Sequence, residues 1–218
     1  MKKYELLKSD KIEIGNLILY RIRRIFNGEL GGYIEKEENL SHESDAWVCD
    51  NARVYGNAQV YGNAQVYNNA QVCDNAQVYG DSRVYGHARV GDKAWVYGNA
   101  RVYGNARVYG HARVYGDAQV GDKAWVYGNA QVYGYAMVSN DAIISNNQEC
   151  VIILNLQYTI TATKNHIQIG CKHLTYEEWE YVDKEKAVFM GLKPENYPVF
   201  KGIIQALIER NKNLNGKG

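Results

Sequence analysis

The residues that most often carry metal-dependent or nucleophilic chemistry are few and scattered in this 218-residue sequence. The cysteines form no Cys-x-x-Cys pair, so we expect no zinc knuckle and a reducing, cytoplasmic compartment; they are Cys49, Cys73, Cys150 and Cys171. A zinc site built from imidazoles needs about three of them close together. The histidines are too dispersed for this; they are His42, His87, His111, His166 and His173. We therefore predict no metal site, no cofactor and no catalytic residue.

A second group of residues recurs at fixed spacing and has the chemistry of molecular recognition. Arginine, tyrosine and tryptophan dominate the hot spots of protein interfaces. Between residues 46 and 145 we select as candidate binding residues Arg83, Arg89, Arg101, Arg107, Arg113, Tyr79, Tyr97, Tyr115, Trp95 and Trp125. The same stretch balances eight Lys and Arg against seven Asp, and the whole chain has a net charge of +1. An anionic ligand or a nucleic acid would therefore be attracted only locally.

These residues sit in a six-residue repeat. Valine recurs every six residues from Val48 to Val138, and Ile144 follows. Alanine stands two residues before each, with Ser82 as the sole exception. In a strand, alternate side chains point to opposite faces, so alanine and valine share one face and the residue between them points the other way.

The position two residues after each valine predicts the turns. It is always Gly, Asn or Asp, as in Asp50, Gly56 and Asn68. These residues adopt the left-handed backbone conformation at a low free-energy cost, whereas other residues are destabilised there by about 1–2 kcal/mol. The pattern predicts a short strand followed by a tight corner, repeated without interruption. A single unit cannot bury its own apolar face, so the units must coil and stack.

The run of Val-x-x-x-Ala-x units resembles the hexapeptide-repeat superfamily. That resemblance implies a left-handed parallel β-helix of triangular section, in which three hexads make one coil and residues eighteen apart stack. The sequence is also similar to YdcK-like proteins and their phage and prophage relatives. This likeness is carried by residues 28–41 (GELGGYIEKEENLS), 167–171 (IQIGC) and 175–179 (TYEEW) together with the repeat.

Stacking at eighteen residues orders the candidate binding residues into columns. One predicted tyrosine ladder is Tyr61, Tyr79, Tyr97, Tyr115 and Tyr133, and a shorter one is Tyr67, Tyr85 and Tyr103. Arg83 would lie beside Arg101, and Arg89 beside Arg107, with Arg113 on the third face. Trp47, Trp95 and Trp125 occupy the same outward position in their hexads. Two interpretations stay open: these side chains stack on one another for stability, or they form an interaction surface.

The superfamily resemblance also implies two kinds of enzyme. Its acyltransferases build a site from a histidine and a loop extruded from the coils, usually between subunits, and its carbonic anhydrases hold zinc with histidines of neighbouring coils. Here the hexads run from Val48 to Ile144 with no inserted loop. His87 and His111 occupy corner positions twenty-four residues apart, which places them on different sides of a three-sided coil.

We predict three parts along the chain: an N-terminal hairpin cap (1–45), the repeat (46–145), and C-terminal strands with two helices (146–218). Gly15-Asn16 and Lys164-Asn165 are predicted hairpin turns. Thr175 and Glu178 form a capping box that opens a helix ending at Gly191, and a second helix begins near Pro198. The second helix carries an apolar stripe that must be covered; it comprises Val199, Phe200, Ile203, Ile204, Leu207 and Ile208.

The fold class predicted from the sequence is an all-β repeat, a single-stranded parallel β-helix with a small β-rich N-terminal cap and an α+β C-terminal cap. The function we expect is that of a non-enzymatic binding protein. The phage resemblance suggests an accessory factor that engages a host component, such as a defence system, through its caps or its repeat face. A protein partner is expected, an anionic ligand or nucleic acid is an alternative, and no membrane association is expected. The C-terminal helix could form a homodimer or homotrimer. The competing functions are an acyltransferase at a subunit interface and a structural assembly rod.

Overall fold

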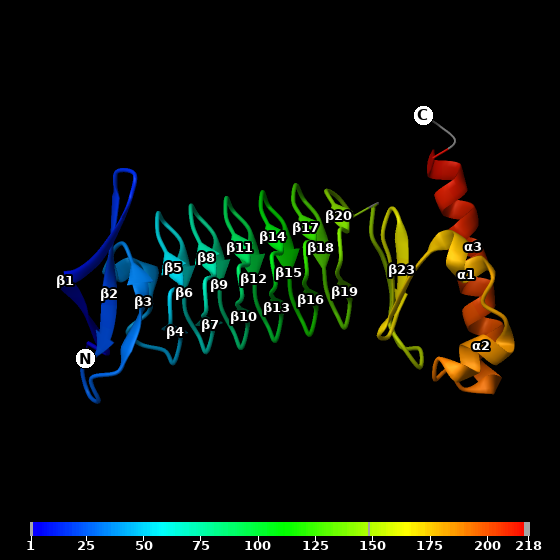
Figure 1. The fold of residues 1–218 in the computed structure, drawn as a ribbon, viewed down its shortest axis with the longest axis horizontal. Helices are drawn as coiled ribbons and strands as arrows, with labels where there is room; N and C mark the ends of the chain where they lie inside the picture. The colour runs from blue at the N-terminus through cyan, green and yellow to red at the C-terminus, as the bar shows by residue number, and fades with distance from the viewer. Residues whose placement is uncertain (1, 148, 216–218) are drawn as a thin grey trace. The chain divides into compact units, whose positions relative to one another are not determined.

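A computed structural model describes residues 2–147 and 149–215 of the chain. The chain divides into two compact units, residues 1–147 and residues 148–218. The first unit contains an N-terminal hairpin and the repeat, and the second contains a small sheet and helices (Figure 1).

Each hexad of the first unit forms one two-residue strand (Figure 1). The strands are β4 (Trp47–Val48), β5 (Arg53–Val54), β6 (Gln59–Val60), β7 (Gln65–Val66), β8 (Gln71–Val72), β9 (Gln77–Val78), β10 (Arg83–Val84), β11 (Arg89–Val90), β12 (Trp95–Val96), β13 (Arg101–Val102), β14 (Arg107–Val108), β15 (Arg113–Val114), β16 (Gln119–Val120), β17 (Trp125–Val126), β18 (Gln131–Val132), β19 (Met137–Val138) and β20 (Ile143–Ile144).

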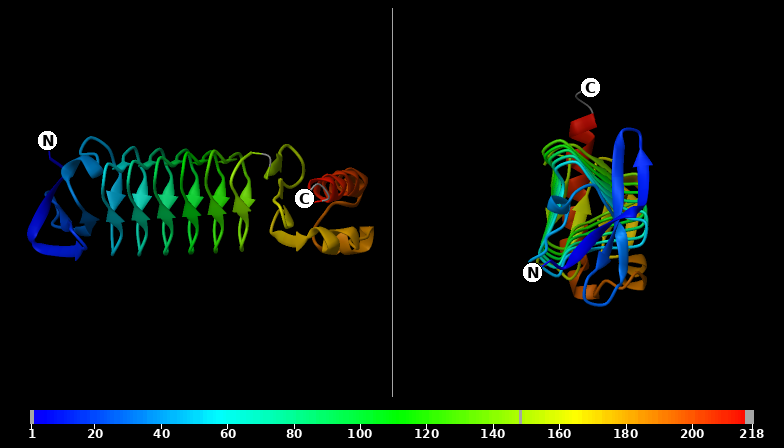
Figure 2. Two further views of the ribbon diagram at one scale, coloured as in Figure 1. Left: turned by 90° about the horizontal axis from the view of Figure 1, so that it is seen from above. Right: turned by 90° about the vertical axis from the view of Figure 1, so that its left-hand side faces the viewer.

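Every third strand pairs in parallel, so the coils have three flat sides, which we call faces A, B and C (Figure 2). Face A is β5-β8-β11-β14-β17-β20, face B is β6-β9-β12-β15-β18, and face C is β4-β7-β10-β13-β16-β19. Residues eighteen apart are register partners, as Val66, Val84 and Val102 are. The predicted fold class, a parallel β-helix of stacked coils with a β-rich N-terminal part and an α+β C-terminal part, is confirmed.

The interior of the coils is filled by the repeated small and β-branched residues. The alanines and valines of the repeat are almost completely buried, which confirms the predicted inward face. Ser82, the one exception to alanine, is also buried, and its hydroxyl lies 3.3 Å from the carbonyl oxygen of Val96. The hydroxyl is therefore satisfied inside an otherwise apolar core.

The corners adopt the left-handed backbone that the sequence predicts. All sixteen positions from Asp50 to Asn140 that lie two residues after a valine have a positive φ, between 53° and 72°. Where the residue is aspartate, its side chain has a further role. Asp50 Oδ2 accepts a hydrogen bond of 2.9 Å from the backbone N–H of Asn68, its partner in the next coil, and Asp92 does the same for Gly110.

The N-terminal part closes the first coil. β1 (Tyr4–Ile14) and β2 (Leu17–Arg24) form the predicted antiparallel hairpin, and β2 pairs with β3 (Leu30–Ile34). β3 then pairs in parallel with β5, so the parallel stacking begins before the first hexad. A Cβ on Gly32 would lie 2.6 Å from a carbonyl oxygen of the first coil, so only glycine permits this approach. The finer division of the chain at residue 45 stays a prediction.

A buried asparagine completes the contact between the N-terminal part and the coils. After β3 comes a short 3-10 helix, η1 (Glu37–Asn39). The Asn39 side-chain amide donates to the carbonyl oxygens of Gly56 and Ala58, at 3.1 and 2.8 Å. Its own oxygen accepts from the backbone N–H of Lys36. These bonds satisfy strand-edge carbonyls that would otherwise be left open at the end of a β-helix.

Trp47 differs from the expectation of an outward, accessible side chain. It occupies the outward register, opposite Gln65, but only 5% of it is exposed. The Arg24 guanidinium lies 4.2 Å from its ring centroid, and the Tyr4 ring packs edge-on against it. The N-terminal hairpin covers this residue, so Trp47 belongs to the cap and not to an open face.

The second unit contains a four-stranded antiparallel sheet and three α-helices. The strands are β21 (Val151–Ile153), β22 (Ile160–Ala162), β23 (His166–Ile169) and β24 (Lys172–Thr175). The helical segments are α1 (Tyr176–Glu180), α2 (Lys184–Phe189), the 3-10 helix η2 (Pro194–Asn196) and α3 (Tyr197–Asn215). The predicted turn at Lys164-Asn165 joins β22 to β23, and the capping box of Thr175 and Glu178 is present.

The predicted continuous helix from Thr175 to Gly191 is wrong. The helix breaks at residues 181–183, because Asp183 caps a new helix and its side chain accepts from the backbone N–H of Lys186 at 2.8 Å. Lys201 of α3 donates to the carbonyl oxygen of Glu180, the last residue of α1, and to that of Val182 in the break. The chain therefore turns between α1 and α2 where a single helix was expected.

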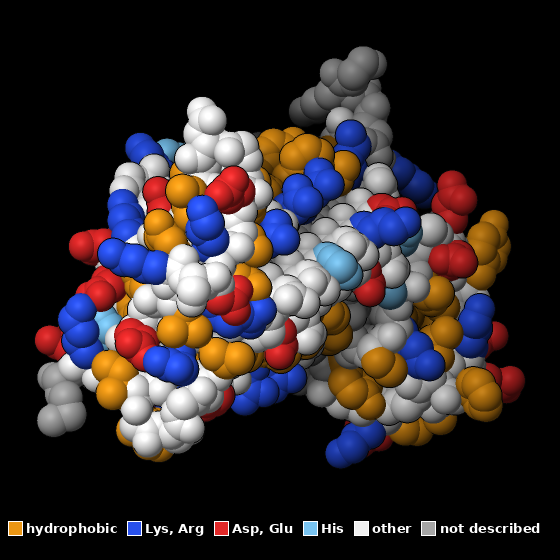
Figure 3. Space-filling model, turned by 60° about the vertical axis from the view of Figure 1, so that its left-hand side comes forward, with side chains coloured by type: hydrophobic (Ala, Val, Ile, Leu, Met, Phe, Trp, Pro, Cys, Tyr) orange, Lys and Arg blue, Asp and Glu red, His pale blue; other side chains and the backbone are white. Residues whose placement is uncertain are grey.

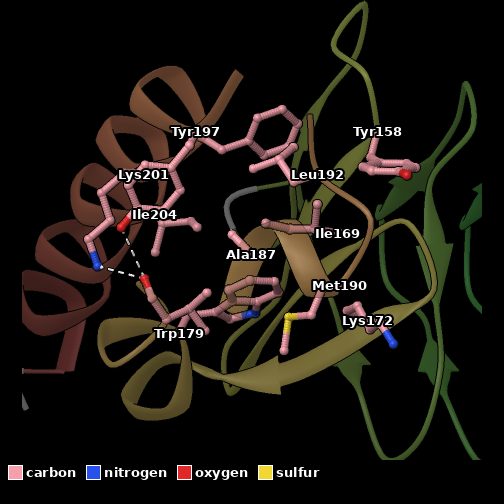
Figure 4. Close-up of a pocket in the computed structure, with 12 residues that line it drawn as sticks. Tyr158, Ile169, Lys172, Trp179, Ala187, Met190, Leu192, Tyr197, Lys201 and Ile204 are labelled. Carbon is pink, nitrogen blue, oxygen red and sulfur yellow. Dashed lines mark hydrogen bonds between the residues drawn. The ribbon is translucent and has the colours of Figure 1, made fainter. Parts of the chain in front are cut away.

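The apolar stripe of α3 is buried within its own unit, where it packs with α1, α2 and the sheet. Phe200, Ile204 and Leu207 are buried, but Val199 is 54% exposed and is not part of the buried stripe. A small apolar cavity of about 30 Å³ lies beside Trp179, Ala187 and Ile204 (Figure 4). Among the described residues, no helix combines the length and the apolar character needed to cross a membrane.

Candidate binding surfaces of the solenoid

The tyrosines of two corners form the predicted ladders. In the first, neighbouring rings lie 4.8–5.5 Å apart between centroids, with their planes within 16° of parallel. It contains Tyr61, Tyr79, Tyr97, Tyr115 and Tyr133, and we call it the long ladder. The second contains Tyr67, Tyr85 and Tyr103, at 4.9 and 5.4 Å. Stacked at this spacing, the rings contribute to stability whether or not they also bind a partner.

The candidate arginines lie on all three faces. Arg83 and Arg101 are register partners on face C, Arg89 and Arg107 are partners on face A, and Arg113 lies on face B. All five are exposed. Within residues 2–147 and 149–215, none of them forms an ion pair, since the ion pairs lie in the N-terminal part and the second unit. Figure 3 shows basic and acidic side chains interspersed on the side of the molecule that it presents.

A shallow hollow on face B is lined by two of the candidate binding residues, Trp95 and Arg113. It has a volume of about 310 Å³ and is lined by Asn75, Gln77, Lys93, Trp95, His111 and Arg113. The Arg113 guanidinium lies 4.8 Å from the Trp95 ring centroid. The Trp95 ring also contacts Tyr79 of the long ladder edge-on, at 6.5 Å. Tyr79, Trp95, Tyr97 and Arg113 are thus neighbours, with the long ladder along one side.

A second hollow lies on face A, with a volume of about 400 Å³. Its lining includes Arg89, Arg107 and Trp125, together with Asp92, Tyr109 and Tyr127. The Arg107 guanidinium lies 5.7 Å from the Trp125 ring centroid. The two candidate tryptophans therefore each pair with an arginine of a neighbouring coil. Arg83 and Arg101, on face C, join neither hollow.

The third corner holds a cluster that the sequence did not suggest. Its column is Tyr55, Cys73, Gly91, Tyr109 and Tyr127, so the tyrosine ladder is interrupted. A Cβ on Gly91 would lie 2.6 Å from the Tyr109 ring, which shows that the ring occupies the space over this glycine. Burial raises the pKa of the Cys73 thiol to about 12, and the thiol donates a hydrogen bond of 3.0 Å to Asp74. A thiol that retains its proton is a poor nucleophile.

The signal for this arrangement lies in two identical hexads. Gly-Asp-Lys-Ala-Trp-Val occurs at residues 91–96 and again at residues 121–126. In each, glycine replaces the ladder residue, and a tyrosine of an adjacent coil leans over it, Tyr109 over Gly91 and Tyr103 over Gly121. Each also supplies the tryptophan of one hollow.

The two histidines of the repeat lie apart from each other. His87 and His111 are exposed corner residues on two different edges of the coil, and their backbone N–H groups donate to the next coil. Across the described part of the chain, no group of three or more His, Cys, Asp or Glu residues could hold a metal ion. Register partners stay eighteen apart from β4 to β20, so no loop is extruded from the coils.

The repeat sequence itself identifies the solenoid. A family model described as the YdcK β-solenoid repeat matches residues 46–62, 58–74, 70–86, 94–108, 106–122 and 130–146. The coils of the solenoid are thus similar to YdcK β-solenoid repeats. No curated protein gives a significant match to the sequence.

The matched ranges of the YdcK repeat do not run continuously through the solenoid. They leave out residues 87–93 and 123–129. The first of these stretches contains Gly91 and Lys93, and the second contains Trp125. The two gaps overlap the hexads at residues 91–96 and 121–126, which supply the tryptophans of the two hollows.

Proposed function

We propose that this protein is a non-enzymatic binding protein whose YdcK-type solenoid engages a partner protein through its outward arginine and aromatic side chains. The observation that supports this most directly is the set of five exposed arginines without an ion pair in the described chain. Arg83 and Arg101, and likewise Arg89 and Arg107, stand side by side in adjacent coils. Like charges directly opposite in a sheet are destabilising, and an acidic partner surface would remove that cost.

The aromatic side chains support the same function. Trp95 and Trp125 each lie beside an arginine and line a hollow. A tryptophan–arginine pair on a rigid backbone presents apolar area and charge with little conformational entropy left to lose on binding. The likeness to phage- and prophage-borne proteins extends the proposal to a partner in the cytoplasm of a host cell, such as a component of a defence system.

Affinity capture from host lysate, followed by quantification of bound proteins, tests this function. The bait would be the full chain, and the test variant would carry both Arg101→Glu and Arg107→Glu. Both side chains are exposed, so we expect the variant to fold and to lose its specific partners.

A matched control adds negative charge without removing an arginine. Lys184→Glu with Lys193→Glu serves this purpose, because both lysines are exposed in the second unit and the pair makes the same charge change as the arginine variant. The control should retain most of the captured protein. Equal capture by the wild type, the arginine variant and the control would contradict the proposed role of the arginines.

A further inference from the structure

We infer that the hollow on face B is a subsite for acidic side chains of an extended peptide segment, with Trp95 and Arg113 as its central contacts. This inference rests on the proposed function and specifies the chemistry that one of its surfaces recognises. The hollow is lined by three basic side chains, two amides and one indole; they are Lys93, His111, Arg113, Asn75, Gln77 and Trp95.

The three columns of residues on and beside this hollow contain no acid. The outward residues of face B are Gln59, Gln77, Trp95, Arg113 and Gln131, and the long ladder follows them. The row before them is Asn57, Asn75, Lys93, His111 and Asn129. None of these fifteen residues is Asp or Glu, whereas the corresponding row before face C holds Asp45, Asp81 and Asp117. The basic groups therefore have no counter-charge within these three columns.

The acids at the nearest corners are already engaged. Asp74 accepts from the Cys73 thiol and from the backbone N–H of Asp92. Asp92 accepts from the N–H of Gly110, and on the other side Asp117 accepts from Asn99. Carboxylates held by such bonds have fewer lone pairs left for Lys93 or Arg113. No carboxylate of the described chain forms an ion pair with Lys93 or Arg113, so an incoming carboxylate would supply a charged acceptor that these donors lack.

The positive charge of Arg113 affects the pKa of three tyrosines of the long ladder. Burial raises the pKa of the Tyr79, Tyr97 and Tyr115 phenols, and the Arg113 guanidinium acts against this rise in each of them. Its position is fixed by the ring of Trp95 on the preceding coil, at 4.8 Å. An arginine held in place in this way needs little reorganisation to bind a carboxylate bidentately.

The short extent of the basic residues favours a peptide over a nucleic acid as the ligand of this hollow. Lys93, His111 and Arg113 lie in two adjacent coils, which are about 4.8 Å apart. A nucleic acid strand would extend past this short basic group toward the aspartates of both corners, where its phosphates would be repelled. The amides of Asn75 and Gln77 can instead bond the backbone of an extended peptide.

Fluorescence anisotropy with a short, labelled peptide of alternating Glu and Gly tests this inference, with a Gln-Gly peptide of equal length as the neutral control. We expect the wild-type chain to bind the Glu-Gly peptide and not the Gln-Gly peptide. Trp95→Ala and Arg113→Glu should each weaken binding by about tenfold or more. Arg113→Lys should weaken it less than Arg113→Glu, because it keeps the charge but loses the planar contact with Trp95. Arg83→Glu, which makes the same charge change on face C, should leave the affinity within about twofold.

Indole N–H signals in an NMR titration locate the peptide and report folding in the same experiment. The signal of Trp95 should shift on addition of the Glu-Gly peptide, whereas those of buried Trp47 and Trp179 should stay in place in the wild type and every variant. Three results would overturn the inference: no binding of the Glu-Gly peptide, equal weakening by Arg83→Glu and Arg113→Glu, or tighter binding of oligothymidylate through the same residues. If partner capture is still lost with Arg101→Glu and Arg107→Glu, the proposed function stands although this subsite does not.

Discussion

At the scale of single residues, the corners determine whether the chain can coil. Each corner residue has a positive φ, and its partner in the next coil lies close to where a Cβ would be placed. Glycine avoids both problems, whereas aspartate and asparagine tolerate the backbone. Aspartate adds a hydrogen bond to the next coil, as Asp50 does. The choice among Gly, Asn and Asp therefore changes stability without changing the fold.

Gly86 allows this to be tested. Its φ is 72°, and a Cβ there would lie 3.0 Å from the backbone nitrogen of Gly104. Gly86→Ala should lower the free energy of unfolding by about 1–2 kcal/mol. Gly86→Asp should cost less, because its carboxylate would accept from Gly104 N–H as Asp50 accepts from Asn68 in the same column. Urea denaturation of both variants measures the difference, and a greater loss for Asp than for Ala would contradict this account.

The raised pKa of the Cys73 thiol predicts that the stability of the protein decreases at alkaline pH. Burial and the bond to Asp74 raise its pKa from 9.0 to about 12. Between these pH values the unfolded thiol loses its proton while the folded thiol keeps it, so the unfolded state binds fewer protons. This contribution to stability is fully present below pH 9 and decreases as the pH rises. Thermal melts from pH 8 to 11 should show a shallower decline for Cys73→Ala than for the wild type, and an unchanged decline for exposed Cys171→Ala.

At the scale of elements, the sequence predicts the repeat well and the helices less well. Each hexad forms its strand and corner from its own residues, so the period alone defines β4 to β20. The break between α1 and α2 depends on Asp183 capping a new helix and on Lys201, eighteen residues later, binding the carbonyls at the end of the first. The six-residue period predicts that Trp95 and Arg113 lie in the same column, but it does not predict the hollow that they line. It depends on side-chain conformation, such as that which places the Arg113 guanidinium 4.8 Å from the Trp95 ring centroid.

The two sides of a repeat strand should respond oppositely to enlargement. Ala106 is completely buried, so Ala106→Leu should overpack the coil and destabilise it by about 1–3 kcal/mol or more. Gln131 points outward on face B, and Gln131→Leu should change stability by less than about 0.5 kcal/mol. Thermal melts of the two variants test the assignment. The opposite order would mean that the inward and outward positions are exchanged.

Helix α3 offers a matched pair of charge substitutions. Ile204 is buried in the core of the second unit, so Ile204→Asp should destabilise that unit by about 3 kcal/mol or more. Val199→Asp introduces the same charge on the same helix at an exposed position, and it should have little effect. Hydrogen exchange resolved by residue would show whether the loss is confined to residues 149–215. Equal effects of the two substitutions would contradict the burial of the stripe.

At the scale of the whole molecule, the sequence separation of two residues determines whether their side chains are neighbours in the stacked coils. Trp95 and Arg113 are neighbours only because three hexads separate them. In a stacked repeat each coil interacts mainly with its neighbours, so the fold tolerates the loss of a unit better than a compact domain does. A deletion can therefore change the surface while preserving the fold. Removing one hexad leaves the remaining hexads able to coil, but it moves every later residue to the neighbouring face of the solenoid.

Deleting residues 99–104 should therefore preserve the solenoid and abolish the hollow on face B. After this deletion Gln119 would stand beside Trp95, while His111 and Arg113 would move to a different face. Deleting a complete coil, residues 57–74, leaves the eighteen-residue separation of Trp95 and Arg113 intact. We expect both proteins to keep the circular dichroism of the β-helix. The hexad deletion should weaken Glu-Gly peptide binding by about tenfold or more, and the coil deletion should leave it nearly unchanged. Undiminished binding after the hexad deletion would show that the peptide does not need Trp95 and Arg113 together. If the hexad deletion unfolds the protein and the coil deletion does not, the coils close only in complete sets of three hexads.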